Sequence, residues 1–301
     1  MQGTAVAFPS ESESAAPRAR SRAATVLLHS PGWWTGAVGL VLVGLFTFAG
    51  PLVYHQSAYT IHIAEMLSPP DAAFPLGTDS LGRNVLAQLM VGGQVSLLVG
   101  FAAAVFAVVF GTLYGVLAGI AGGLADAVMM RIVDLLRSIP ALFLLLFLDA
   151  FINPTPTIMV VLIAALSWHG VARLARAETL HMRDLDYVEA AKAVGASRWL
   201  IALRHILPGT IQVVVVTATF LVADAILTIA GLSFLGLGLP PPAPNWGGML
   251  ADAMTYMPSG QWWLVYPAGI ALTITLVCLN LVGDALRTVF NPRLAHSRRS
   301  G

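Results

Sequence analysis

Charged side chains are scarce in this sequence. Asp, Glu, Lys and Arg make up only 10% of the 301 residues, whereas 57% are hydrophobic, and the mean hydropathy is +0.79. A soluble domain needs a far more polar exterior than this composition supplies. The composition therefore excludes an ordinary soluble protein and indicates a membrane protein. The net charge of +1 also gives no reason to expect a nucleic-acid partner.

Cysteine, lysine and the motifs of membrane-embedded enzymes are missing or nearly so. The one cysteine, Cys278, allows no intramolecular disulfide and no thiolate metal site, so we expect a small packing residue. The one lysine, Lys192, does not lie in a phosphate-binding glycine loop, so the chain is not expected to hydrolyse ATP. No zinc, serine or aspartyl protease motif occurs, and His169, His181 and His205 are isolated. We predict neither catalytic residues nor a metal site.

Long apolar runs are abundant. A hydrocarbon layer about 30 Å thick needs roughly 20 residues of helix, and lipid offers no partner for unpaired backbone groups. The runs are residues 33–53, 84–125, about 132–151, 155–170, 206–239 and 261–283. The third is the weakest because Asp134, Arg137 and Pro140 interrupt it. The pattern predicts an all-α polytopic membrane protein with six transmembrane helices.

Basic residues set the predicted orientation. If the N-terminus is cytoplasmic, fifteen of the 16 lysines and arginines fall in inner segments, and only Arg83 lies outside. We therefore predict that both termini are cytoplasmic. The apolar run after Trp33 is a full span, which argues against a cleaved signal peptide. The predicted organisation is a disordered cytoplasmic tail at 1–30, a first transmembrane helix at 31–54, an external loop containing GTDSLGRN at 55–92, a transmembrane domain at 93–290 with a cytoplasmic loop at 178–208, and a cytoplasmic tail at 291–301.

Glycines recur at intervals of four in the second run. They are Gly111, Gly115, Gly119 and Gly123. This spacing places them on one helix face and lets another backbone approach closely. The partner helix can belong to this chain or to another subunit.

The densest polar stretch is DYVEAAKAVGASRWLIALRHILPG, residues 186–209, between the fourth and fifth runs. Its composition predicts a short helix, a break at Gly195, a second helix capped by Ser197, and Pro208 near the start of the fifth span. One side of the first helix holds Tyr187, Ala190, Ala191 and Val194. A short amphipathic helix here can dock onto a partner or lie on the membrane surface, and the residues alone leave both readings open.

The same stretch resembles a known family. EAAKAVG, followed by nine residues and HILP, is similar to the EAA signature of permease subunits in ATP-binding-cassette importers, in the dipeptide, oligopeptide and nickel branch. FPLGTDSLGRNVLAQLMVGGQVSLLVG, GGLADAVMMRIVDLLRSIPALFLL and GLSFLGLGLPPPAPNWGGML extend the resemblance over roughly residues 74–290. It implies a type I importer permease fold of the C-type subunit, in the bacterial inner membrane.

The resemblance also implies partners. They are a homologous second permease, two cytoplasmic ATPase subunits that bind ATP and Mg, an extracytoplasmic substrate-binding protein, and membrane lipid. This chain then binds no cofactor and forms half of a pathway for short peptides. Nickel or a metal chelate is the alternative cargo within the same branch. An intramembrane hydrolase and a passive channel are the rival functions.

Site residues follow from the matching positions. The coupling helix and its turn are assigned to Tyr187, Glu189, Ala190, Ala191 and Gly195, with Leu207 and Pro208 closing the motif. The external motif comprises Gly77, Thr78, Asp79, Gly82 and Arg83. This motif either contacts the binding protein or is a capped re-entrant helix in which Asp79 and Arg83 pair. The chain departs from the family at Asn84 and Ile229, where relatives often carry aspartate and glutamate.

Asp224 is the only acidic residue in the fifth run. At about 100° per residue it shares a predicted polar stripe with Thr210, Thr217 and Thr228. A carboxylate in the hydrocarbon layer is costly, so we expect it to face the bundle interior or a water-filled path. There it can attract a peptide amino group or a metal ion. The alternative is an interhelical hydrogen bond between two permeases.

Overall fold

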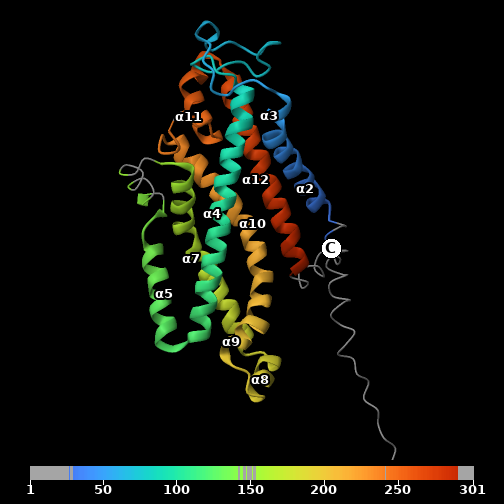
Figure 1. The fold of residues 1–301 in the computed structure, drawn as a ribbon, viewed down its shortest axis with the longest axis vertical. Helices are drawn as coiled ribbons and strands as arrows, with labels where there is room; N and C mark the ends of the chain where they lie inside the picture. Colours follow the sequence, from blue (N-terminus) through green and yellow to red (C-terminus); the bar gives the residue numbers. More distant parts are fainter. Residues whose placement is uncertain are drawn as a thin grey trace, which may run out of the picture.

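The structure is a computed structural model that describes residues 30–141, 154–240 and 242–290, together with Leu27, Phe143, Leu144, Phe147 and Phe151. Within these residues the secondary structure is helical, apart from one isolated β-bridge between Thr78 and Asn84. The long helices run along the length of the molecule, with the loop before α4 at one end and α8 and α9 at the other (Figure 1). The predicted all-α architecture is confirmed for the part of the chain described.

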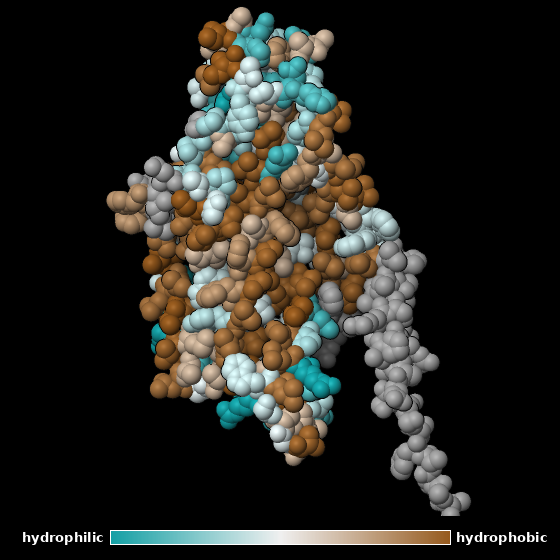
Figure 2. All heavy atoms as spheres, in the orientation of Figure 1, coloured by the Kyte–Doolittle hydropathy of each residue, from teal (hydrophilic) through white to brown (hydrophobic). Residues whose placement is uncertain are grey.

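Five helical stretches in the described ranges are long and apolar enough to cross a membrane. They are Pro31–Val53, which combines α2 (Pro31–Gly44), a π-turn (Leu45–Ala49) and α3 (Gly50–Val53); α4 (Val85–Ala121); α7 (Pro156–Arg183); Arg198–Phe234, which combines α9 (Arg198–Ile201), a π-turn (Ala202–Ile206) and α10 (Leu207–Phe234); and α12 (Trp262–Phe290). Apolar side chains cover the middle of the molecule, and polar ones gather at both ends (Figure 2). This distribution fits a chain that spans a bilayer.

The third predicted span differs from its expected position. The helix there is α5 (Gly123–Ser138), which starts well before Ile132 and ends where Ile139 adopts extended backbone, directly before Pro140. The residue before a proline is pushed out of the helical region, which explains the stop. Much of the remainder of this run lies outside the described residues.

The glycine face of α4 packs against α7 within the same chain. A Cβ atom at Gly111 would lie 2.6 Å from the Trp168 carbonyl oxygen, and one at Gly119 would lie 2.6 Å from the Thr179 Cγ2 atom. The stripe ends there, because α4 stops at Ala121 and Gly123 already belongs to α5, where a Cβ would meet nothing. Since later residues of α4 contact later residues of α7, the two helices run parallel. The chain between them must return along the length of the molecule.

Helix α10 begins at Leu207, so Pro208 lies in its first turn, as predicted. Helical structure is continuous from Arg198 to Phe234, and the π-turn lies immediately before Leu207 and Pro208. Proline has no amide hydrogen and its ring clashes with the carbonyl of the preceding turn, so a wider turn accommodates it. Pro51 follows the first π-turn in the same way.

A short helix, α11 (Trp246–Tyr256), folds back onto the end of the bundle that carries the loop before α4 (Figure 1). Trp246 is fully buried, its indole nitrogen donates to the Leu89 carbonyl oxygen at 2.9 Å, and its backbone nitrogen donates to the Ser96 hydroxyl at 3.2 Å. Because both partners lie on α4, these bonds fix α11 against that helix. Helix α12 packs against α2, α10 and α11.

Candidate functional site

The polar loop of residues 186–209, at the opposite end of the bundle from the loop before α4, has the predicted form of a helix, a break and a second helix. Helix α8 (Asp186–Ala193) ends in a turn in which the Gly195 amide donates to the Lys192 carbonyl at 3.0 Å and the Ala196 amide donates to the Ala191 carbonyl at 3.1 Å. This pair of bonds is a Schellman motif, which needs a left-handed residue at the position of Gly195. The φ angle of Gly195 is 85°.

The loop rests on a small apolar core at the end of α7. Val188 is completely buried, and it packs with Ile201 and Ile206, while Ala191 and Met182 cover them. Ala191 therefore faces this core, whereas Tyr187, Ala190 and Val194, which were predicted on the same side of α8, are exposed. The sequence of α8 alone could not show this difference, because residues of the next helix build the core.

A second connection ties this loop to α7. The Lys192 ammonium donates to the Arg183 carbonyl at 3.0 Å, and a Cβ at Gly209 would collide with the Met182 side chain. Contacts on both sides of the break at Gly195 thus hold the loop against the C-terminal end of α7. Displacing α8 requires moving α7 or breaking these contacts.

The outer side of the loop carries unpartnered polar and apolar groups. Glu189 and Ala190 are exposed, and the Glu189 carboxylate makes no hydrogen bond or ion pair within the described residues. The exposed apolar side chains, called here the apolar tip, are Tyr187, Val194, Trp199, Leu200 and Leu203. The sequence analysis did not assign Trp199, Leu200 and Leu203 to this surface, although large apolar residues in the most polar stretch of the chain could have indicated a contact surface. An apolar surface at the polar end of the molecule marks a contact site.

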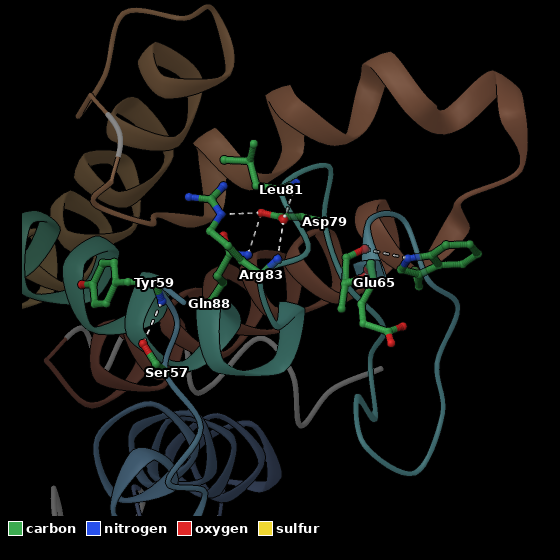
Figure 3. Close-up of polar contacts among 9 residues, drawn as sticks. Ser57, Tyr59, Glu65, Asp79, Leu81, Arg83 and Gln88 are labelled. Carbon is green, nitrogen blue, oxygen red and sulfur yellow. Dashed lines mark hydrogen bonds and ion pairs between the residues drawn. The ribbon is translucent and has the colours of Figure 1, made fainter. Parts of the chain in front are cut away.

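The external motif is a tight turn with an ion pair at its centre (Figure 3). The Asp79 carboxylate accepts from the backbone amides of Leu81 at 2.9 Å and Arg83 at 2.8 Å, and from the Gln88 side chain at 2.9 Å. It also pairs with the Arg83 guanidinium at 2.7 Å. The expected pair is present, but the capped helix that was one reading of the motif is wrong, because α4 begins only at Val85.

Three of the five motif residues shape the turn from inside. Gly77 and Gly82 have φ angles of 69° and 73°, and a Cβ at either would strike a backbone carbonyl. Thr78 is fully buried, and its carbonyl accepts from the Trp263 indole at 3.2 Å. Only the partly buried Asp79 and Arg83 reach the surface.

Asn84 explains one departure from the family pattern. Its side-chain oxygen accepts from the Ala87 amide at 3.1 Å and caps α4, while its nitrogen donates to the Tyr54 hydroxyl at 2.7 Å. The same side chain therefore fixes the start of α4 and the end of the first span. Aspartate can make the cap but cannot donate the second bond in its ionised form.

A small cavity of about 20 Å³ lies beside this turn, lined by Asp79, Ser80, Val85, Gln88, Met249, Asp252, Ala253, Tyr256 and Leu264. Burial raises the pKa of the Asp252 carboxyl, the Arg83 charge lowers it, and the Asp79 charge raises it further. Asp252 lines this cavity, although no spacing in the sequence predicted it, because α11 brings it there from far along the chain.

Asp224 lies on an exposed face of α10 with Thr217 and Thr228 on the same side. Thr228 donates to the Asp224 backbone carbonyl at 2.7 Å, and Thr217 donates to the Val213 carbonyl at 3.3 Å, so both hydroxyls are satisfied within the helix. Thr210 is fully buried and does not belong to this face. Asp224 is exposed on the single chain. Its side chain therefore does not point into the interior of this chain's own helix bundle.

Ile229, the second departure, points into the core. It is 1% exposed and packs in a cluster with Val99, Met159 and Ala225. A carboxylate at this position would be buried in the packing between α4, α7 and α10. Isoleucine is the residue that this surrounding accommodates. In the described ranges, no group of three or more His, Cys, Asp or Glu side chains could hold a metal ion.

Comparison with known proteins connects these features. Residues 111–296 match the family model described as binding-protein-dependent transport system inner membrane component. The chain is 41% identical over 268 residues to the oligopeptide transport system permease protein OppC of Salmonella typhimurium and to that of Escherichia coli K12, covering 88% of this chain and 88% of each relative. It is 40% identical over 260 residues to a putative peptide permease protein of Brucella suis, covering 85% of this chain and 86% of the relative. On the strength of the matched range and these identities, the chain belongs to the family of inner membrane components of binding-protein-dependent transport systems.

Proposed function

We propose that this chain is the permease subunit of an ATP-driven importer and forms half of the translocation pathway for short peptides. The observation that carries the proposal is the exposed surface of α8 and α9. It combines the unpartnered carboxylate of Glu189, the small side chain of Ala190 and the apolar tip, all at the polar inner end of the molecule. Such a surface suits a groove on a cytoplasmic partner.

The partners are two cytoplasmic ATPase subunits, a homologous second permease and an extracytoplasmic substrate-binding protein. ATP and Mg bind to the ATPase subunits, and this chain binds no cofactor. When the ATPases close, they draw the coupling helices together, and the contacts of Lys192 with Arg183 and of Gly209 with Met182 pass the movement to α7. Leu207 and Pro208 follow the π-turn at the base of α10, where the same loop enters the bundle.

The proposed topology has six transmembrane helices with both termini cytoplasmic. Two observations support it. In this arrangement fifteen of the 16 basic residues lie on the inner side or in the inner half of the membrane, and only Arg83 lies outside. The parallel packing of α4 and α7 requires the chain between them to cross back, and α5 covers part of that return.

At the outer end, we propose that the surface around Asp79 and Arg83 contacts the binding protein, while Gly77, Thr78 and Gly82 hold the turn in shape. The Asp224 face, with Thr217 and Thr228, is proposed to line the pathway shared with the second permease. Peptides are proposed rather than nickel or a metal chelate because the relatives are named as permeases for oligopeptides and peptides.

The test is uptake by the full complex in proteoliposomes. We expect a labelled tripeptide to accumulate only when the binding protein is present outside and ATP is present with the ATPase subunits. Accumulation without ATP would indicate a passive channel, and cleavage of the peptide by the purified chain would indicate a hydrolase. Either result would contradict the proposal, as would ATP-dependent uptake of nickel with no uptake of peptide.

A further inference from the structure

A group of basic side chains lies between α5 and α7, apart from the sites above. This inner cationic cluster consists of Arg137 at the end of α5 and His169 and Arg173 on α7, with Asp134 at its edge. Arg173 forms an ion pair with Asp134, and both side chains are about half exposed, at 49% and 48%. The Arg137 side chain is exposed and has no hydrogen bond or ion pair within the described residues.

His169 contributes an unsatisfied polar atom to the cluster. Its Nδ1 atom is buried and has no hydrogen-bond partner in the described part of the chain. His169 and Arg173 lie four residues apart on α7, and Asp134 and Arg137 lie three residues apart on α5. The ion pair between Arg173 and Asp134 brings these neighbouring side chains of the two helices together.

The cluster lies at membrane depth. The exposed apolar side chains of α4 extend from Leu98 to Leu117, about 28 Å along the helix, which matches a hydrocarbon layer of about 30 Å. Gly119 packs on Thr179, so Leu117 is level with residue 177 of the parallel helix α7. Counting back along α7 puts Arg173 roughly 6 Å and His169 roughly 12 Å inside the inner boundary.

The cluster does not face lipid on α5. The large apolar residues exposed on that helix are Leu124, Val128, Ile132 and Leu135. At about 100° per residue, Arg137 points roughly opposite to this stripe. Charged groups inside the membrane face protein or a water-filled cavity, because hydrocarbon cannot solvate them. The lipid face of α5 and its charged face are therefore distinct.

We infer that the inner cationic cluster lines the inner half of the translocation pathway and binds the C-terminal carboxylate of a passing peptide. This inference rests on the proposed function. Two guanidinium groups outnumber the single carboxylate of Asp134, and arginine forms paired hydrogen bonds with carboxylates. Asp134 already occupies Arg173, so an incoming carboxylate competes with it and is released again. A transport site needs such moderate binding, because a substrate that binds too tightly does not leave.

The test compares two peptides in the full complex, reconstituted in proteoliposomes of defined lipid. One tripeptide has a free C-terminal carboxylate and the other has a C-terminal amide. Each variant is compared with wild type on each peptide, so any preference of the binding protein cancels. We expect Arg137→Gln to lower ATP-dependent uptake of the free acid about tenfold and to leave uptake of the amide within about twofold of wild type.

The matched control is Arg131→Gln. Arg131 is also exposed on α5, but it lies beside the apolar stripe that starts at Leu124 and Val128. We expect no difference between the two peptides for this variant. If Arg137→Gln does not assemble, Arg137→Lys keeps the charge and loses the paired geometry, and we expect about a threefold loss for the free acid alone.

Other outcomes would overturn the inference. Equal loss on both peptides that disappears when anionic lipid is omitted would show that the cluster binds a lipid headgroup. No loss on either peptide, or equal loss in every lipid, would show that Arg137 does not bind the carboxylate. A wild-type complex that imports neither peptide would contradict the proposed function itself, which separates the two failures.

Discussion

Replacing Gly195 tests whether the coupling loop depends on backbone conformation. The φ angle of 85° is left-handed, where alanine is disfavoured by roughly 1–2 kcal/mol. No atom lies within 4 Å of the position that a Cβ would occupy, so the cost is one of conformation and not of crowding. A strain of this size changes a local equilibrium about 5- to 30-fold.

The expected result has a local and a functional part. In Gly195→Ala, the Ala196 amide, which donates to the Ala191 carbonyl, should exchange with solvent about 5- to 30-fold faster. Peptide-stimulated ATP hydrolysis by the full complex should fall with it. Gly195→Asn is the control, because asparagine tolerates the left-handed region despite its larger side chain.

The two variants separate backbone strain from bulk. If strain governs, Gly195→Asn retains more exchange protection and more ATPase stimulation than Gly195→Ala. If Gly195→Asn is the more damaging of the two, side-chain volume governs the site and the reasoning from φ is refuted. Hydrogen exchange measured by mass spectrometry and ATP turnover measured in proteoliposomes give independent answers.

Four further predictions concern packing, pH, the pathway and topology. Gly115→Ile should lower the thermal unfolding temperature of the purified chain by several degrees, because the isoleucine side chain would enter the contact with α7. Gly170→Ala should not lower the unfolding temperature, because its Cβ meets open space. Equal effects of the two variants would contradict the packing. Because the folded-state pKa of Asp252 is raised, the stability contributed by this carboxyl is present below its ordinary pKa of 3.8 and is lost as pH rises through the higher folded-state pKa. The unfolding temperature of Asp252→Asn should therefore rise relative to that of wild type as pH is raised from about 4 to 7. A difference that does not change with pH would contradict this prediction. Asp224→Asn should assemble normally but reduce peptide uptake, since the amide keeps hydrogen bonding and loses the charge; uptake equal to wild type at all peptide concentrations would remove its pathway role. A cysteine at Ser80 should react with an impermeant reagent from outside, and reaction only after permeabilisation would overturn the orientation.

Residue spacing predicted most of the helices and the packing of α4. The apolar runs identified five of the long helical stretches, and the four-residue interval of Gly111, Gly115 and Gly119 identified a face that does pack closely. It could not name α7 as the partner, because a small-residue face fits any helix that approaches it. Nor could it give the bounds of α5, which depend on how the chain turns at Gly122 and before Pro140.

Spacing was misleading where a turn imitates a helix. Asp79 and Arg83 are four residues apart, as in a helical ion pair, yet their contact is made by a turn that Gly77 and Gly82 bend with positive φ angles. Pro208 was predicted near the start of the fifth span and lies in the first turn of α10, but the sequence did not reveal the π-turn that makes the helix continuous back to Arg198. Asp252 was missed because its surroundings come from distant segments.

The close contact between α4 and α7 has a mechanical consequence. Backbone lies against backbone at Gly111 and Gly115, and at Gly119 the short, branched Thr179 side chain fills the contact, so no long flexible side chain lies between the helices at these positions. We therefore expect α4 and α7 to move as one rigid unit. The Arg183 guanidinium donates to the Gly119 carbonyl at 2.6 Å and holds the two helices together near the C-terminal end of α4. We therefore expect a displacement of α8 to move α4 and α7 together, including the end of α4 that adjoins the turn holding Asp79.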